Sequence, residues 1–390
     1  MATSFYFNNG GTTTDFSDAF IRRDLFSSGG LWLWGTNSSG ELGDSTVVNK
    51  SSPIQTVAGG TNWKQVAFGD AHTMAIKTDG TLWAWGIGTS GELGDNTLLS
   101  KSSPIQTVAG GTNWRQVSCG SSHTGAIKAD GTLWLWGYNA SYGALGDNTI
   151  AGKSSPVQTI AAGSNWRQVS CGGFTTTAIK TDGTLWAWGF NAGQLGDNTG
   201  VNKSSPVQTV AGGTNWKQVS CGYNYAAATK TDGTLWLWGS NTYGQLGNST
   251  NTGTSSPIQT ISAGTNWKQV ACGGDILSGH TAAIKTDGTL WVWGHNTYGQ
   301  LGDTTITHKS SPVQTVTGGT NWKIVSSGGT NTTAIKTDGT LWVWGYNNAG
   351  QLGDNTIVSK SSPVQTVTGG TNWKIVSTGG DNTAAITDIF

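Results

Sequence analysis

A pattern of three tryptophans and one proline recurs seven times and constrains the fold more than any other feature of the chain. It accounts for all 21 tryptophans and all seven prolines among the 390 residues. Two tryptophans of each copy stand in a Leu-Trp-x-Trp-Gly string, the third follows an asparagine, and the proline lies in Ser-Ser-Pro-(Ile/Val)-Gln-Thr. Successive prolines are separated by 51, 52, 50, 51, 55 and 51 residues. A period of this size indicates a propeller, a solenoid or an array of repeats.

One copy, followed from residue 61, contains four short segments with the character of β-strands. Residues 61–69 alternate apolar and polar, and residues 73–77 lead into Thr-Asp-Gly, a strong hairpin signal because glycine accepts positive φ. Residues 81–86 return antiparallel, and residues 104–108 suit an edge strand, where a proline can spare its N–H. Four strands per period are typical of a propeller blade rather than of a helical solenoid.

The two ends of the chain together complete one repeat. The first copy begins at its third strand with Leu31, and the last copy stops after its second strand, residues 383–386. We therefore predict an all-β, seven-bladed β-propeller with four-stranded blades, in which residues 31–56 and 373–388 form one composite closing blade. Closure removes the open sheet edges that would otherwise pair with other molecules.

Charge and hydrophobicity exclude several classes of partner. Only 11% of the residues are charged, with 21 basic and 21 acidic side chains, and the basic residues are distributed by the repeat instead of being concentrated. Such a chain is not expected to bind nucleic acid. No segment is long enough to span a membrane, and the start of the chain lacks the charged and then apolar pattern of a signal peptide. We expect no membrane insertion.

The motifs resemble those of the regulator-of-chromosome-condensation family, the RCC1-like repeats, of the bacterial and phage type with near-identical copies. The matching strings are Val-x-x-Gly-x-x-His-Thr-x-Ala, Asp-Gly-Thr-Leu-Trp, Trp-Gly-x-Asn and Gly-Gln-Leu-Gly-Asp-Asn-Thr, which recur over residues 31–388. The resemblance implies a seven-bladed propeller with a shared closing blade. It implies less about function, because members include a nucleotide-exchange factor, a secreted β-lactamase inhibitor and ubiquitin-ligase modules. Unlike the chromatin-type member, this chain has short loops, no basic arm and no inserted wedge; its largest insertion is four residues near Ile276.

Cysteine and histidine occupy repeat positions that other residue types also fill. Four blades carry cysteine five residues after the third tryptophan, where other blades have Phe, Ser or Thr, and three blades carry histidine where others have Thr, Tyr or Asn. A metal site does not tolerate such exchange, so we predict reduced, metal-free packing cysteines near the inner strand and hydrogen-bonding histidines at a strand start. The residues are Cys119, Cys171, Cys221, Cys272, His72, His123 and His280. His295 and His308 are interpreted as isolated loop residues.

No constellation suited to catalysis stands out from the repeat. The only glutamates, Glu41 and Glu92, share one loop position, and most aspartates lie in Asp-Gly turns or Gly-Asp-Asn-Thr loops, where they can cap backbone N–H groups. The chain has neither a phosphate-binding loop nor a nucleophile elbow. A catalyst usually breaks symmetry to build one site. We predict that the protein is not an enzyme and has no catalytic residue, metal or cofactor.

The tryptophans allow two interpretations. Trp83 and Trp85 of one strand are two residues apart and point to one face, with Leu82 and Ala84 on the other, which is the pattern of a core between blades. The alternative is a ring of exposed tryptophans that stack on sugars, which would make the protein a carbohydrate-binding propeller. We expect core packing.

Residues 1–30 form the one stretch outside the repeat, while residues 31–390 form the propeller domain. This segment holds five of the nine phenylalanines and the only pair of adjacent basic residues. The repeats are so alike that no blade offers a distinctive face, so we expect this aromatic arm to dock the protein onto a partner or larger assembly. The expected docking residues are Phe5, Tyr6, Phe7, Phe16, Phe20, Arg22, Arg23 and Phe26. The alternative is a strap that packs on the propeller.

Three function classes follow. The first is a non-enzymatic structural or interaction protein, for example a phage virion or surface assembly component, because a composition rich in Thr, Asn and Gly looks extracellular although no export signal is present. The second is an intracellular regulator such as a guanine-nucleotide exchange factor, on family analogy alone. The third is a propeller whose loops bind a glycan or a protein. We expect a virion or extracellular surface location, with the cytoplasm as the alternative.

Overall fold

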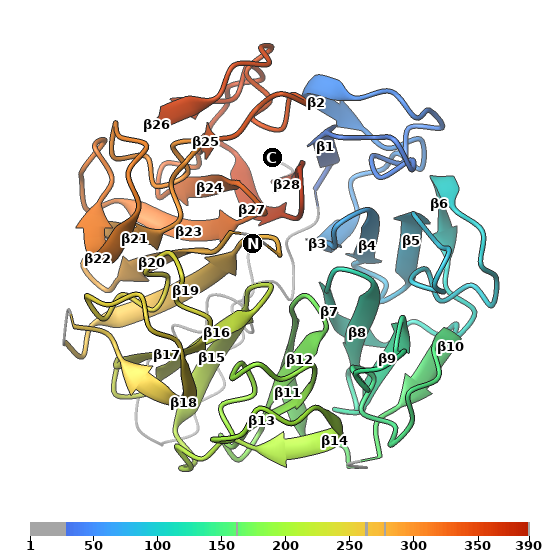
Figure 1. The fold of residues 1–390 in the computed structure, drawn as a ribbon. Helices are drawn as coiled ribbons and strands as arrows, with labels where there is room; N and C mark the ends of the chain where they lie inside the picture. Colours follow the sequence, from blue (N-terminus) through green and yellow to red (C-terminus); the bar gives the residue numbers. More distant parts are fainter. Residues whose placement is uncertain (1–28, 161–162, 262–263, 277, 389–390) are drawn as a thin grey trace, which may run out of the picture.

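The computed structural model describes residues 29–388 except 161–162, 262–263 and 277. They form seven four-stranded antiparallel sheets, arranged as blades around a central channel (Figure 1). Blade 1 contains, from the channel to the rim, β3 (Trp63–Phe68), β4 (His72–Lys77), β5 (Leu82–Gly86) and β6 (Lys101–Gln106). The predicted all-β, seven-bladed propeller is confirmed.

Blades 2 to 6 repeat this order of inner, second, third and outer strand. Blade 2 contains β7 (Trp114–Cys119), β8 (His123–Lys128), β9 (Leu133–Gly137) and β10 (Lys153–Gln158). Blade 3 contains β11 (Trp166–Cys171), β12 (Thr175–Lys180), β13 (Leu185–Gly189) and β14 (Lys203–Gln208). Blade 4 contains β15 (Trp216–Cys221), β16 (Tyr225–Lys230), β17 (Leu235–Gly239) and β18 (Thr254–Gln259). Blade 5 contains β19 (Trp267–Gly273), β20 (His280–Lys285), β21 (Leu290–Gly294) and β22 (Lys309–Gln314), and blade 6 contains β23 (Trp322–Ser327), β24 (Asn331–Lys336), β25 (Leu341–Gly345) and β26 (Lys360–Gln365).

Blade 7 is the composite blade that closes the ring. Its inner strands are β27 (Trp373–Thr378) and β28 (Asn382–Thr387), and its outer strands are β1 (Leu31–Gly35) and β2 (Lys50–Gln55). Strand β1 pairs with β28 along its whole length. The predicted closure by both ends of the chain is confirmed, and it leaves neither β1 nor β28 with an unpaired edge.

The core lies between the blades. Leu82 and Ala84 of β5 pack against Trp114 and Trp136 of blade 2, whereas Trp85 on the opposite face of β5 packs into the cluster shared with blade 7. The second and third tryptophans of each repeat are at most 3% exposed in all seven blades. For these tryptophans the predicted packing between blades is confirmed.

The first tryptophan of each Leu-Trp-x-Trp-Gly string is only half-buried. In blade 1 the Lys77 ammonium lies 4.4 Å from the centre of the Trp83 ring and 4.7 Å from that of Trp63. Blades 2 to 6 repeat this arrangement. The lysine therefore covers a tryptophan face that would otherwise lie open to solvent.

The outer strands begin earlier than their sequence suggests. Strand β6 starts at Lys101, before the expected residues 104–108, and its pairing with β5 shifts register between Ala84 and Gly86. Pro104 falls within this irregularity, where a missing N–H breaks no regular ladder bond. The proline thus marks a bulge inside the edge strand and not the start of the strand.

Neighbouring blades are linked by the long loops that follow the third strands. Ser45 donates its backbone N–H to the carbonyl of Ser102 in the next blade, at 2.8 Å, and Asn355 does the same to Ser51 of the closing blade, at 2.9 Å. At five junctions a buried or half-buried glutamine amide also bonds both backbone groups of a valine in the next inner strand, as Gln65 does with Val117. Blades 6 and 7 carry Ile324 and Ile375 at this position, so their junctions depend more on apolar contact.

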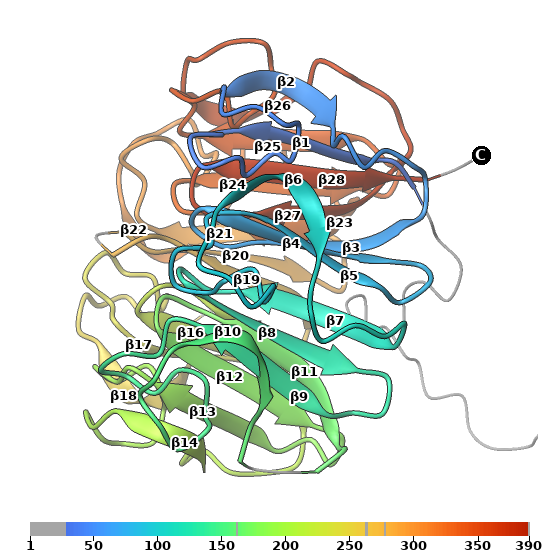
Figure 2. The ribbon, with the colours of Figure 1, turned by 90° about the vertical axis from the view of Figure 1, so that its right-hand side faces the viewer.

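The two faces of the propeller are built from different loops. Because the strands alternate in direction, the loops after the inner strands (inner loops) and those after the third strands (outer loops) emerge on one face, and the Asp-Gly hairpins lie on the other, the hairpin face. Gly29 bridges Trp63 on the hairpin face, where β28 also ends, so the chain enters and leaves the ring on this face. Figure 2 shows β28 running toward one side of the blades. No helix among the described residues has the length and hydropathy of a membrane span.

Candidate interaction surface

The seven blades act as an internal comparison that separates structural positions from variable ones. All six hairpins read Asp-Gly-Thr, and in each the aspartate accepts bonds from the threonine, as in Asp79 with Thr81. Three positions instead change from blade to blade. The residue after Trp-Gly is Thr36, Ile87, Tyr138, Phe190, Ser240, His295 or Tyr346. The residue before the outer-loop glycine is Ser39, Ser90, Tyr142, Ala192, Tyr243, Tyr298 or Ala349, and the residue before the second strand is Ala71, Ser122, Phe174, Asn224, Gly279, Thr330 or Asp381.

All three variable positions lie on the same face, because all belong to inner or outer loops. We call this the variable face. The six hairpins of the opposite face all read Lys-(Thr/Ala)-Asp-Gly-Thr, so the hairpin face changes much less from blade to blade. The expectation that no blade offers a distinctive face is therefore wrong: the hairpins are nearly identical, whereas these loop positions differ in size and aromatic character from blade to blade.

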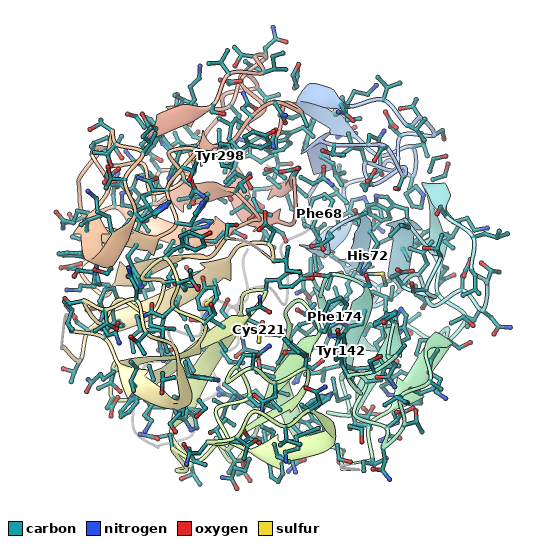
Figure 3. The ribbon with its side chains drawn as sticks, viewed as in Figure 1. Phe68, His72, Tyr142, Phe174, Cys221 and Tyr298 are labelled. Atoms are coloured by element: carbon teal, nitrogen blue, oxygen red, sulfur yellow. The ribbon has the colours of Figure 1, made fainter. Side chains whose placement is uncertain are left out.

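Aromatic rings gather on the variable face over blades 2 to 4. Tyr142 lies 5.0 Å from Phe174 and 5.0 Å from Phe190, measured between ring centres. Tyr138 and Tyr223 extend the group, at 5.6 and 5.9 Å from Phe174. Figure 3 shows Tyr142 and Phe174 side by side next to the central opening. All five side chains are half-buried, so each presents part of a ring to solvent.

A second aromatic group covers blades 4 to 6. His295 and His308 stack with ring centres 4.8 Å apart, and Tyr243 lies 4.7 Å from His295 and 5.0 Å from His308. Tyr298 and Tyr346 are 4.5 Å apart. Tyr298 lies across the central opening from Tyr142 (Figure 3). The interpretation of His295 and His308 as isolated residues is wrong, because the outer loop folds back on itself and brings its two ends together.

The two groups together form an aromatic crescent with a gap. Its members are Tyr138, Tyr142, Phe174, Phe190, Tyr223, Tyr243, His295, Tyr298, His308 and Tyr346. Blades 7 and 1 carry Thr36, Ser39, Ile87 and Ser90 at the equivalent outer-loop positions. The ring is seven-fold in its backbone, whereas the aromatic crescent covers only five of its seven blades.

Carboxylates stand at or beside the mouth of the channel on this face: Asp70 lines it, and Asp275 and Asp381 follow the lining residues Gly274 and Gly380. Asp70 and Asp381 come from inner loops of blades 1 and 7, and Asp275 comes from the inserted loop of blade 5. Although Asp70 reaches solvent, surrounding protein raises the pKa of its carboxyl, and repulsion by Asp275 and Asp381 adds to the shift. Burial likewise raises the pKa of Asp381, against the lowering effect of the bond it accepts from Gln351, at 3.1 Å. Tyr223 lines the mouth together with Asp70, and the pKa of its phenol is raised, first by burial and then by the charge of Asp70.

The mouth is held in shape by backbone contacts between inner loops. Ser121 donates its N–H to the carbonyl of Gly172, at 3.2 Å, and Gly380 donates to Gly69, at 3.3 Å. A Cβ added at Gly69 would lie 2.4 Å from the carbonyl oxygen of Gly120, so only glycine allows the loops to approach this closely. The hollow at the mouth measures about 90 Å³. Since a water molecule needs roughly 10–15 Å³ by this kind of measure, the hollow has room for the end of a side chain.

The four cysteines lie at the ends of the inner strands and line the channel, as predicted for a packing position. Cys119, Cys171 and Cys272 are buried and Cys221 is half-buried. Burial raises the pKa of each thiol, to about 11 for Cys221 and further for the others. These thiols stay protonated at neutral pH, so they are poor nucleophiles and poor metal ligands. Within residues 29–388, as far as they are described, no three His, Cys, Asp or Glu side chains cluster as a metal site would require.

Replacing all four cysteines with serine is expected to leave a folded propeller that is a few kcal/mol less stable at most. Ser327 already occupies the equivalent position in blade 6 and bonds the carbonyl of Ala271 at 3.4 Å, as the Cys119 thiol bonds that of Ala67 at 3.5 Å. Thermal melting of the purified variant measures the effect. Stoichiometric zinc in the wild-type protein, or a disulfide seen by mass spectrometry, would contradict the assignment.

The predicted role of His72, His123 and His280 as hydrogen-bonding residues is confirmed. Each ring Nε2 lies 2.8–3.0 Å from a threonine hydroxyl of the next blade, for example Thr124 in the case of His72. The Thr124 hydroxyl donates to the carbonyl of Glu92, at 3.0 Å, so its oxygen is left to accept from the histidine. This assigns the N–H to Nε2 and leaves a neutral imidazole between the blades.

The residues expected to dock a partner lie outside the described part of the chain. Phe5, Tyr6, Phe7, Phe16, Phe20, Arg22, Arg23 and Phe26 all precede Gly29. What the structure adds is the position of Gly29, on the face opposite the aromatic crescent. Sequence reasoning missed the crescent because its members share no motif; a blade-by-blade alignment that scores differences instead of identities would have found it.

Comparisons with known proteins agree with the repeat pattern. The RCC1-like domain matches residues 115–389, and the regulator of chromosome condensation (RCC1) repeat matches residues 28–76 and 79–127. The ultraviolet-B receptor UVR8 of Arabidopsis thaliana is 31% identical over 87% of this chain, and the mitochondrial RCC1 domain-containing protein RUG3 of the same plant is 28% identical over 84%. The chain spans 66% and 64% of the lengths of these two relatives.

Among solved structures, the fold is similar to that of Prp20p from Saccharomyces cerevisiae, which was described with its binding properties to Gsp1p and histones. The TM-score is 0.82 at 19% sequence identity, and the match covers 97% of this chain and 95% of Prp20p. At this level of identity the similarity establishes the fold alone.

Proposed function

The chain belongs to the regulator-of-chromosome-condensation (RCC1) repeat family, and from this premise we propose that it is a non-enzymatic interaction protein that binds a protein partner with its variable face. The observation that carries the proposal is the concentration of aromatic blade-to-blade differences in the loops of one face, where they create the aromatic crescent. Selection for fold alone would act equally on both faces. Aromatic side chains are also the residues that contribute most to binding at protein interfaces.

The crescent has the properties of a binding surface rather than of a core. Tyr298 is 39% exposed, and the remaining tyrosines and phenylalanines of the crescent are half-buried, so their rings are held by neighbours and still reach solvent. Rings fixed in this way lose little conformational entropy on binding. Prp20p, of similar fold, binds Gsp1p and histones, which supports a protein as the partner.

A photo-crosslinking experiment tests the proposal. We expect p-benzoylphenylalanine at Tyr142 or Tyr298 to form a defined adduct with a protein in the native host, and the same group at the exposed hairpin residues Thr181 or Thr286 to form none. The triple variant Tyr142→Ser, Phe174→Ser, Tyr298→Ser serves as the functional test, because other blades carry serine at these repeat positions. It should melt like the wild type and lose partner binding by tenfold or more. Equal adducts from both faces, or unchanged binding by the triple variant, would overturn the proposal.

Attachment through the arm is a separate prediction. The chain enters the ring at Gly29 on the hairpin face, so an arm anchored in an assembly leaves the variable face pointing outward. Deleting residues 2–24 is expected to leave the propeller folded, by circular dichroism, and still able to form the Tyr142 adduct, but to abolish copurification with the assembly. Normal incorporation of the truncated protein would make residues 1–28 an intramolecular strap and not an anchor.

The more specific hypotheses remain predictions with their own measurements. Copurification with intact phage particles tests the virion component. Accelerated release of labelled nucleotide from a small GTPase tests the exchange regulator, and a glycan array tests the carbohydrate-binding propeller. All three are compatible with a partner bound at the variable face, so none of these results by itself replaces the crosslinking experiment.

A further inference from the structure

Charge is distributed unequally between the two faces of a chain whose formal net charge is zero. The inner and outer loops of the variable face contain no lysine or arginine in any blade. Their carboxylates are Glu41, Asp44, Asp70, Glu92, Asp95, Asp147, Asp197, Asp275, Asp303, Asp354 and Asp381. Most basic residues lie at the hairpin ends of the inner and second strands, as Lys64 and Lys77 do in blade 1.

Most of the acidic groups on the variable face are compensated within the protein. The outer-loop aspartates pair with the lysine that begins the outer strand, as Asp44 does with Lys50, at 3.3 Å. Glu41 and Glu92 are 1% exposed and accept backbone bonds from Ser39 and Ser90. Among the ion pairs of the described residues, none includes Asp70 or Asp381. The uncompensated negative charge of this face is therefore concentrated at the channel mouth.

The charge and the aromatic rings occupy complementary parts of the variable face. The crescent runs over blades 2 to 6, and Asp70 and Asp381 stand in its gap, in blades 1 and 7. Tyr223 connects the two parts, because it lines the channel mouth together with Asp70. Carboxylates beside aromatic rings form the environment that favours an ammonium or guanidinium group, through ion pairing and cation–π attraction together.

Resting on the proposed function, we propose that the variable face binds a cationic, partly apolar segment of its protein partner. Lysine or arginine side chains of this segment enter the mouth beside Asp70 and Asp381, and its apolar side chains lie on the crescent. Charge complementarity identifies this occupant: a polyanion is repelled by the mouth, and a neutral segment leaves two carboxylates partly desolvated without a partner. A second copy of the chain presents its lysines packed over tryptophans, as Lys77 is over Trp83, so it offers a poorer match than a free basic segment.

Binding of defined peptides to the full chain tests this inference. The probe is a fluorescently labelled decapeptide of alternating Lys and Trp, compared with decapeptides of alternating Glu and Trp and of alternating Lys and Ser. We expect the Lys-Trp peptide to bind best, and its affinity to fall when salt is raised from 50 to 300 mM. The variant Asp70→Asn, Asp381→Asn is expected to raise its Kd at least tenfold. The control Asp182→Asn, Asp287→Asn removes the same charge from the hairpin face and should change Kd less than twofold.

The outcomes separate this inference from the proposed function. Equal binding of the Glu-Trp peptide, or equal effects of the two charge variants, would overturn the cationic occupant even if the Tyr142 adduct forms. Self-association that Asp70→Asn, Asp381→Asn abolishes would assign the face to a second copy and overturn it as well. If the charge variant melts differently from the wild type, the variant Asp275→Asn, in the exposed inserted loop, replaces it. That variant must then weaken binding of the Lys-Trp peptide for the inference to stand. Absence of any variable-face adduct would instead contradict the proposed function.

Discussion

A chain that ends at Thr371 is expected to aggregate or to lose cooperative melting, because the deletion removes the inner half of the closing blade. Strands β27 and β28 disappear, and β1 loses the partner with which it pairs from Leu31 to Gly35. The unpaired edge of β1 then becomes a template for pairing with other chains. In an open array of repeats, deletion of two terminal strands would only shorten the array. In this protein the same deletion opens a closed ring.

The deletion also removes apolar contacts with both neighbouring blades. Trp373 and Val376 pack against Leu341 and Val343 of blade 6, and Ala384 and Ile386 pack in the cluster that contains Trp63 and Trp85 of blade 1. Losing a buried tryptophan together with several aliphatic side chains costs on the order of 10 kcal/mol. That is comparable to the whole stability of a typical domain. Hydrogen bonds between blades are lost as well, such as those from Asn331 to the Thr383 hydroxyl and from Gln351 to Asp381.

Size-exclusion chromatography and calorimetry measure the outcome, with the deletion of residues 2–24 as the control. A synthetic peptide of residues 372–390 should restore cooperative melting when added in excess, since it can supply the missing strands. A truncated protein that stays monomeric and melts like the full chain would contradict closure by the composite blade.

The blades and their closure could be predicted from the sequence because the same pattern of strand and turn residues recurs seven times. Each complete copy contains the buried tryptophans, the hairpin glycine and the edge-strand proline at fixed spacings. The incomplete copies at the two ends of the chain supply complementary strands. The strand bounds predicted from the sequence are wrong where a local irregularity changes the pairing of two strands. Pro104 was expected near the start of a strand but sits within a bulge, because the preceding residues pair with β5 before the register shifts.

The functional face could not be predicted, because it is built by contacts between residues that look unrelated in the sequence. His295 and His308 meet because Asn296 closes their loop, donating its amide to the carbonyls of Thr305 and Thr307 at 3.1 and 3.2 Å. The same asparagine recurs in the Trp-Gly-x-Asn motif, so the residue that closes the loop was visible in the sequence. Its effect, which is to bring the two ends of the loop together, was not. The partners of Phe174 come from the outer loop of blade 2 and the inner loop of blade 4, and no spacing rule connects them.

Acid is expected to destabilise the propeller strongly, because three histidines are buried in neutral form between blades. Burial lowers the pKa of His72 and of His280 to about 3 and that of His123 to about 4. In the unfolded chain a histidine titrates near 6.5. Between these values the unfolded chain binds protons that the folded protein cannot, so the free energy of unfolding falls as pH falls below about 6.5. Each histidine contributes about 2 kcal/mol of this loss at pH 5, and the three together contribute about 6 kcal/mol.

Other buried groups change stability with pH, some in the opposite direction. Burial raises the pKa of Glu41 and of Glu92, so on acidification these carboxyls bind protons in the folded state before they do so in the unfolded chain. Their contribution to the free energy of unfolding therefore rises as pH falls. His295 acts in the same direction as the inter-blade histidines, since burial lowers its pKa to about 4. A measurement on the wild type alone would therefore mix several contributions. A variant that changes only the three inter-blade histidines isolates theirs.

The variant His72→Asn, His123→Asn, His280→Asn is the matched comparison, because Asn331 and Asn382 already occupy this position in blades 6 and 7. Asn331 bonds the threonine of the next blade, Thr383, at 3.3 Å, so the substitution keeps a bond of the same kind and removes the titrating ring. Denaturant unfolding at pH 7.5, 6 and 5 gives the pH dependence for each protein. The smaller side chains leave cavities that lower stability at every pH, and the test lies in the slope. We expect the variant to lose about 6 kcal/mol less than the wild type between pH 7.5 and pH 5. Parallel pH profiles for the two proteins would show that the histidines are already protonated in the fold, and the neutral imidazole assigned from the Thr124 hydroxyl would then be wrong.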